Sequence, residues 1–254
     1  MSAAHTVRGW VVPEGLPEPE VAELEVAGWT VRHPDGDAEW IGRVGRRVRR
    51  GASALRSLPA DELVGLLGSV GVRFLDPSDP LRREALDALP ATAGVSPEMA
   101  REILDGMAED WTQDRLRSAL EADVGSPRAL DGTVRMSRSR TRALGPELSV
   151  QVVSGSVPGV GATALLRSLL VKGPTLVKPG RGDVVLPMLM ARELARLHPV
   201  LEGAIAVVYW PGGRTSWEDA VLGAADVAVA YGTDASVQAL RDRTPVTTRF
   251  IGYH

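Results

Sequence analysis

Cysteine is absent from this 254-residue sequence. Its absence excludes disulfide bonds, thiolate metal sites and a thiol nucleophile within this polypeptide. Long apolar runs are absent too: none reaches the roughly 18 residues that a membrane-spanning helix needs. The first residues, MSAAHTVRGW, lack the basic-then-apolar order of a signal peptide. We therefore expect a cytoplasmic protein with no membrane span.

Aromatic residues are scarce at 4%, and there is no excess of basic charge, since the net charge is −3. This balance argues against a general nucleic-acid binder. Hydrophobic residues make up 44% of the chain, enough to bury the core of one large or two small domains. The arginines within 43–50 are interpreted as a solvated helix face. Those within 135–142 are interpreted as an exposed connector, with contact to an anionic ligand or partner as the alternative.

The hydrophobic pattern changes character along the chain. Residues 5–34 contain short alternating stretches separated by Pro and Gly, which favours strands and turns. Residues 40–122 show helical spacing, and 123–147 resemble a join rich in Gly, Pro, Ser and Arg. We predict a mixed strand and mostly helical region over 1–145 and a Rossmann-like nucleotide-binding region over 146–254.

After the join, strand and helix patterns alternate. Strands are predicted at LSVQVV, TLVK, AIAVVYW, DVAVAYG and TTRFIG, with helices between them. Ser216 and Asp219 are interpreted as a capping-box-like pair ahead of a short helix. Such repeated units indicate an α/β fold with a parallel sheet, helices on both faces, and ligand binding at the carboxyl ends of the strands.

The turn after the first of these strands carries a loose dinucleotide fingerprint. Gly159, Gly161 and Ala164 fit G-x-G-x-x-A ahead of a leucine-rich helix. The acidic residue expected about 20 positions later to hold the ribose hydroxyls is missing, and Lys178 stands in its place. A cation there favours the 2′-phosphate of NADP(H). The alternative is a solvated lysine that ends a strand.

Several segments in order resemble one known family. GSVPGVGATALLRSLLVKGPTLVKPG, VVYWPGG, DVAVAYGTDASVQALR and RFIGY are similar to the LuxC-type long-chain acyl-CoA reductases, of the aldehyde dehydrogenase superfamily. The resemblance is good over 148–253 and looser before it. It implies an aldehyde-dehydrogenase-like fold and NADPH-dependent reduction of a long-chain fatty acyl-CoA or acyl-protein thioester to a fatty aldehyde.

The resemblance also implies roles for particular residues. Lys178, with Pro179 and Gly180, corresponds to the contact with the adenosine ribose or 2′-phosphate. Gly232, Thr233 and Asp234 correspond to a turn that faces the pyrophosphate at a helix start. The turn at Trp210, Pro211 and Gly212 is assigned to the same edge, with a plain strand-ending turn as the alternative.

Three departures from the family pattern limit this assignment. Ser156 stands where the family usually has an asparagine that holds the substrate oxygen, and Gly180 replaces a usual serine. The family's nucleophilic cysteine belongs to a second half that follows the segment matched here. We therefore expect this chain to be the N-terminal, cofactor-binding half, from a truncated reading frame or as a fragment, and inactive alone.

The remaining expectations concern partners, metal sites and alternative functions. The missing thiol would come from a separate C-terminal half or an acyl-transfer partner protein, and the full-length family is expected to form homo-oligomers. No metal site is expected, because the histidines are scattered. The alternative function is a non-catalytic nucleotide-binding or scaffold module. Another nucleotide-dependent enzyme is disfavoured, since no Walker-type or kinase signature is present.

Overall fold

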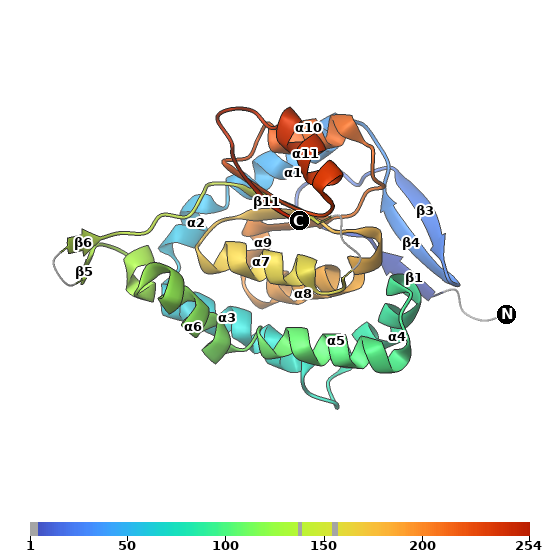
Figure 1. The fold of residues 1–254 in the computed structure, drawn as a ribbon, viewed down its shortest axis with the longest axis horizontal. Helices are drawn as coiled ribbons and strands as arrows, with labels where there is room; N and C mark the ends of the chain where they lie inside the picture. The colour runs from blue at the N-terminus through green and yellow to red at the C-terminus, as the bar shows by residue number, and fades with distance from the viewer. Residues whose placement is uncertain (1–4, 137–138, 154–156) are drawn as a thin grey trace.

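The computed structural model describes residues 5–136, 139–153 and 157–254. Its centre is a six-stranded sheet of order β11-β10-β7-β8-β9-β2 (Figure 1). The strands are β2 (Trp10–Val11), β7 (Ser149–Val153), β8 (Thr175–Lys178), β9 (Ile205–Val208), β10 (Val227–Tyr231) and β11 (Arg249–Tyr253). Strands β7 to β11 pair in parallel, and β2 pairs antiparallel with β9. The expected parallel α/β sheet is confirmed, with one antiparallel strand added at its edge.

Helices cover both faces of this sheet. Helices α7 and α8 pack on one face and α1, α10 and α11 on the other. Their bounds are α1 (Ala38–Arg49), α7 (Val160–Leu170), α8 (Val185–Leu197), α10 (Thr215–Leu222) and α11 (Asp234–Arg243), with the short α9 (Pro199–Ala204) leading into β9. Because side chains alternate across a strand, Val177 joins the core under α7 while its neighbour Leu176 joins the core under α10. This double coverage explains why every residue of β7, β8 and β9 is buried.

The N-terminal region forms a second, smaller sheet. Its order is β1-β4-β3, with β1 (His5–Arg8), β3 (Val21–Val26) and β4 (Trp29–Pro34). Between this sheet and the central one, the Gly9 N–H donates to Arg32 O at 2.7 Å, and the Tyr209 N–H donates to Gly9 O at 2.8 Å. The expected strands of 5–34 are thus found, and this region is hydrogen-bonded to the central sheet.

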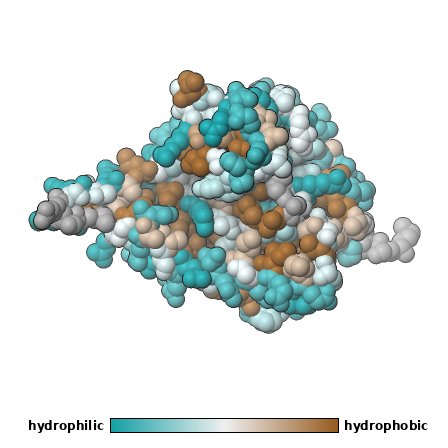
Figure 2. Space-filling view, in the orientation of Figure 1, coloured by the Kyte–Doolittle hydropathy of each residue, from teal (hydrophilic) through white to brown (hydrophobic). Residues whose placement is uncertain are grey.

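A helical layer follows, as the spacing over 40–122 predicts. Its elements are α2 (Ala52–Ser57), α3 (Ala60–Gly71), η1 (Val72–Phe74), α4 (Pro80–Ala93), α5 (Pro97–Glu109), α6 (Gln113–Val124) and η2 (Pro127–Leu130). Side chains of Asp79 and Ser96 cap α4 and α5, each ahead of a proline in the first turn. Apolar side chains gather between α5 and α7 on the face seen in Figure 2. The division of the chain near residue 145 stays a prediction.

Two details differ from the expected local structure. The join over 123–147 contains a hairpin of β5 (Val134–Met136) and β6 (Ser139–Thr141) that projects from the body (Figure 1). Ser216 does not cap α10: it lies inside that helix, and Asp219 accepts from Arg243. The capping-box prediction is therefore wrong. Within the described ranges, no helix has the length and apolar character to cross a membrane.

Candidate functional site

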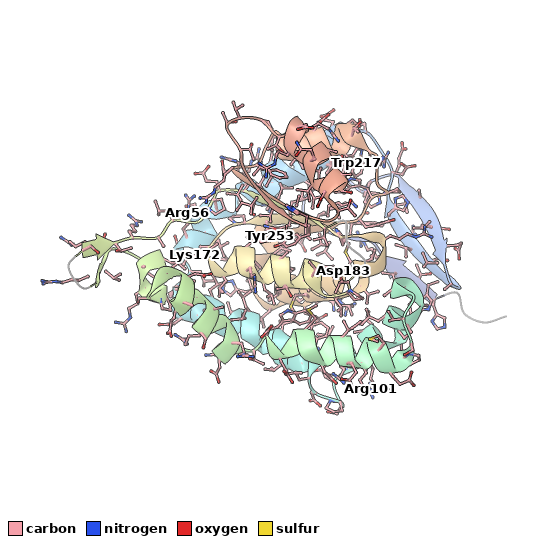
Figure 3. The ribbon with its side chains drawn as sticks, viewed as in Figure 1. Arg56, Arg101, Lys172, Asp183, Trp217 and Tyr253 are labelled. Atoms are coloured by element: carbon pink, nitrogen blue, oxygen red, sulfur yellow. The ribbon has the colours of Figure 1, made fainter. Side chains whose placement is uncertain are left out.

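The turn between β7 and α7 is held by a carboxylate from the following loop. The backbone N–H groups of Gly159 and Gly161 donate to Oδ1 and Oδ2 of Asp183, each at 2.6 Å. Asp183 ends η3 (Arg181–Asp183), directly after β8, and is buried. A Cβ at position 161 would lie 2.9 Å from Asp183 Oδ2, so this close approach requires glycine. Figure 3 shows Asp183 beside the start of α7, with Lys172 near the opposite end.

This arrangement corrects the interpretation of the glycine fingerprint. An acidic residue does follow the glycines at the expected distance, but it binds their backbone N–H groups. The N–H groups at the start of α7 already bind a carboxyl group, so they are not open to a pyrophosphate, as the fingerprint would imply. Burial raises the pKa of the Asp183 carboxyl to about 7, and the two N–H donors oppose that rise.

Lys178 ends β8 with its ammonium short of partners. The residue is 6% exposed, and among the described residues its ammonium makes no hydrogen bond or ion pair. Its Nζ lies 6.0 Å from the ring centroid of Tyr209, at the outer limit of a cation–π contact. Burial lowers the pKa of Lys178, while Glu218 raises it. Glu218 is itself paired with Arg243 at 2.6 Å, so little negative charge is left for Lys178.

A second cation, Arg181, lies on the same edge and was missed from the sequence. It follows Pro179 and Gly180, which are buried, and is itself exposed. Burial raises the pKa of Tyr209, and the positive charge of Arg181 opposes that rise, so Arg181 acts electrostatically on the tyrosine that Lys178 approaches. In the described part of the chain no carboxylate pairs with Arg181. The only feature of the sequence that could have identified Arg181 is its basic side chain, three positions after Lys178.

The turn after β9 presents backbone to solvent while its aromatic residue is buried. The ring of Trp210 is fully buried and packs against Trp217, with ring centroids 5.5 Å apart. Pro211 is half-buried and Gly212 is exposed. The structure therefore places Trp210 in the core beneath α10, so any contact of this turn with a ligand would come from Pro211 and Gly212.

The start of α11 lies at the carboxyl end of β10. Thr233 is the N-cap, and its Oγ1 accepts from the Ser236 N–H at 3.4 Å. Thr233 and Asp234 are exposed, and the Gly232 N–H donates to Tyr253 O at 3.1 Å. The helix start favours negative charge, but the Asp234 carboxylate already supplies one. A phosphate here would therefore rely on the Thr233 hydroxyl and backbone N–H groups.

Other predicted features are easily placed. Lys178, Gly232 and Thr233 lie on one edge of the sheet, because β8 and β10 flank β7 in parallel. Ser156, the predicted oxyanion-side residue, lies outside the described residues. Where the chain is described, no three His, Asp or Glu side chains gather as metal ligands.

Comparison of the fold with solved structures identifies its type. The Delta-pyrroline-5-carboxylate dehydrogenase of Mycobacterium tuberculosis is similar over 98% of this chain and 48% of its own, with a TM-score of 0.75 and 14% sequence identity. The NADP-dependent glyceraldehyde-3-phosphate dehydrogenase of Bacillus halodurans, solved with NADP, is similar over 92% of this chain and 49% of its own, with a TM-score of 0.70 and 13% identity. The fold is therefore aldehyde-dehydrogenase-like, as expected.

Comparison of sequences gives the family. A long-chain acyl-protein thioester reductase of Aliivibrio fischeri is 25% identical over 192 residues, which is 72% of this chain and 39% of the relative. The chain thus spans about two fifths of the length of this relative. The family model of acyl-CoA reductase (LuxC) matches residues 55–254. With most of its residues inside that match and an aldehyde-dehydrogenase-like fold, this chain belongs to the LuxC acyl-CoA reductase family.

Proposed function

We propose that this chain supplies the NADPH-binding part of a reductase that converts long-chain fatty acyl thioesters to fatty aldehydes. Family membership supports the oxidoreductase class, and the name of the Aliivibrio fischeri relative supports an acyl thioester substrate. The observation that carries the choice of NADPH is the buried Lys178 ammonium, which has no ion pair among the described residues.

The chemistry of Lys178 suits a 2′-phosphate. A buried ammonium without a counterion is unfavourable, and its lowered pKa reflects that cost. A phosphate group would supply the missing negative charge through charge-assisted hydrogen bonds. A carboxylate at this position would instead repel the phosphate, as in enzymes that select NADH. The exposed Arg181, three residues after Lys178, adds a second positive charge whose field reaches Tyr209.

The remaining edge residues would hold the rest of the cofactor. Gly232 and Thr233 lie at the start of α11, across β7 from Lys178, where the Thr233 hydroxyl can donate to a pyrophosphate. The start of α7 is excluded from this role, because Asp183 occupies its N–H groups. NADPH, when bound, would supply the hydride that reduces the acyl carbon.

The covalent step requires a group that this sequence lacks. No cysteine is present to accept the acyl group as a thioester, and a serine alkoxide is a poor leaving group from the reduced adduct. We propose that the thiol comes from a cysteine-bearing C-terminal portion of the reductase or from an acyl-transfer partner. A module that binds nucleotide and never catalyses is the alternative, supported by the same lack of cysteine.

Calorimetric titration of NADPH and NADH against Lys178→Met tests the cofactor proposal. Methionine keeps the bulk of the side chain and removes its charge. A charge-assisted hydrogen bond contributes on the order of 1 to 2 kcal/mol, so NADPH binding should weaken roughly five- to thirty-fold while NADH binding changes little. The salt dependence of NADPH binding should also flatten, since screening acts on the lost charge.

Arg101→Ala provides the control, because this exposed arginine lies on α5, in the outer helical layer and not on a strand or strand-end turn of the central sheet (Figure 3). It should leave both affinities unchanged. Equal affinities of wild type and Lys178→Met for both nucleotides, at low and high salt, would rule out the role proposed for Lys178.

A further inference from the structure

Two tyrosines stack at the carboxyl edge of the sheet, beside the proposed cofactor site. The rings of Tyr231 and Tyr253 lie 5.0 Å apart between centroids, with 12° between their planes. They are register partners at the ends of β10 and β11. Tyr253 is 55% exposed, so a large part of its ring faces solvent. The pair therefore presents an open aromatic surface.

The backbone holds this pair in a fixed position. The Gly232 N–H donates to Tyr253 O at 3.1 Å, which ties the ends of the two strands together. A Cβ at Gly252 would lie 2.5 Å from Val237 Cγ1, so α11 packs closely on the strand just before Tyr253. Successive side chains point to opposite faces, and Tyr253 is thereby directed to the face that carries α7. With the backbone held in this way, the Tyr253 ring can move mainly by rotation about its side-chain bonds.

The strand order places the tyrosines at one end of a line of strand ends. Lys178 ends β8, Thr233 follows β10, and Tyr253 ends β11, in the sheet order β11-β10-β7-β8. Three strand spacings of about 4.8 Å separate β8 from β11, or roughly 14 Å. An extended dinucleotide can cross that distance. Lys178 and the tyrosines face opposite sides of the sheet, so the dinucleotide would pass over the strand ends, where Gly232 carries no side chain.

We propose that Tyr231 and Tyr253 form a stacking surface for the nicotinamide ring of NADPH. This inference rests on the proposed function, which assigns the adenosine end to Lys178 and leaves the nicotinamide end for β10 and β11. Aromatic rings favour offset stacking with another flat ring over a face-to-face sandwich, and the dihydronicotinamide ring is close to flat. The outer face of Tyr253 offers such a surface, while its inner face is supported by Tyr231. Both tyrosines act as positioning residues, because they orient the ring without exchanging protons or electrons.

Fragments of the cofactor test this assignment separately from the adenosine site. Tyr253→Ala should weaken the binding of NADPH and of reduced nicotinamide mononucleotide roughly three- to tenfold, the range of one aromatic stacking contact. It should leave 2′,5′-ADP binding unchanged, since that fragment lacks nicotinamide. Tyr253→Phe should bind all three ligands like wild type. Tyr253→Leu, which keeps an apolar side chain without a flat ring, should behave like Tyr253→Ala.

Lys178→Met should show the reverse pattern, with weaker 2′,5′-ADP binding and unchanged binding of the mononucleotide. Calorimetry supplies the affinities, and the emission of bound NADPH reports the surroundings of its nicotinamide ring. Unchanged NADPH affinity and emission in Tyr253→Ala would overturn the stacking surface and leave the proposed function standing. Equal losses for NADPH and 2′,5′-ADP would also overturn it. A wild-type chain that binds neither NADPH nor 2′,5′-ADP would contradict both proposals.

Discussion

Two opposing effects act on the carboxyl group of Asp183. Complete burial favours the neutral acid, whereas two short hydrogen bonds from backbone N–H groups favour the anion. Burial is the larger effect and raises the pKa to about 7, against 3.8 for an ordinary aspartate. The folded protein therefore keeps a proton at this site between about pH 4 and pH 7 that the unfolded chain has already released.

This difference predicts a loss of stability as the pH rises. From pH 5 to pH 8, the contribution of Asp183 to the free energy of unfolding should fall by about 2 to 3 kcal/mol and then stay level. Urea unfolding at both pH values, for wild type and Asp183→Asn, isolates the effect, because the asparagine does not titrate. The free energy of unfolding of wild type, relative to that of Asp183→Asn, should fall from pH 5 to pH 8. An equal difference in free energy of unfolding at pH 5 and pH 8 would show that the pKa of the Asp183 carboxyl group is not raised.

At the scale of whole elements, Lys172 connects three segments that are distant in sequence. It lies in the turn after α7 with a positive φ of 58°, and it is 1% exposed. Its Nζ donates to Asp131 Oδ1 at 2.5 Å and to Arg56 O at 3.0 Å. Asp131 in turn accepts from the Ala60 N–H at 3.0 Å. The ammonium thus joins the turn after α7 to the end of α2 and the start of α3.

Lys172→Met should destabilise the fold by about 2 kcal/mol, because it removes the ammonium that donates to the Arg56 carbonyl and to Asp131. The loss of stability is limited because the Asp131 side chain is 37% exposed and can bind water. Arg117→Met is the matched control, because it removes the ion pair between Arg117 and Asp61, whose side chains are 33% and 56% exposed respectively. It should lower the free energy of unfolding by about 0.5 kcal/mol or less. Equal melting temperatures for Lys172→Met and Arg117→Met would contradict this role.

The elements that the sequence predicts are those with a local cause. Leu165, Leu166 and Leu169 repeat at helical spacing, and the apolar run of β10 marks a strand buried on both faces. The parallel order of β7 to β11 follows from their alternation with helices. Lys178 was identified because it ends such a strand. Its role in binding stays a prediction.

Features that depend on contacts between distant segments could not be predicted in this way. Strand β2 has two residues, too few for a periodic signal, and it is defined only by its pairing with β9. Asp183 binds backbone N–H groups, which leave no mark in the side-chain sequence. The stacking of Tyr231 on Tyr253 depends on the register between two strands, and register is a property of the folded sheet.

For the whole molecule, we expect cofactor binding without catalysis. The purified chain, mixed with NADPH and a long-chain acyl-CoA, should oxidise no cofactor, because no cysteine is present to accept the acyl group. Adding a cysteine-bearing C-terminal portion from a LuxC-family relative should give thioester-dependent oxidation, followed by absorbance. The same portion with its cysteine changed to alanine is the control. Turnover by this chain alone would show that another group can take the role of the thiol.

The antiparallel strand β2 also sets an order of events during synthesis. Trp10 pairs with Val208, so nearly two hundred residues separate the partners. Contacts of such long sequence separation are slow to form, since loop closure must precede them. At a ribosomal rate of about 5 to 20 residues per second, the N-terminal strand waits roughly 10 to 40 seconds for β9 to be made. During that time the segment around Trp10 lacks its native partner strand, so the central sheet gains this edge strand only after most of the chain has been made.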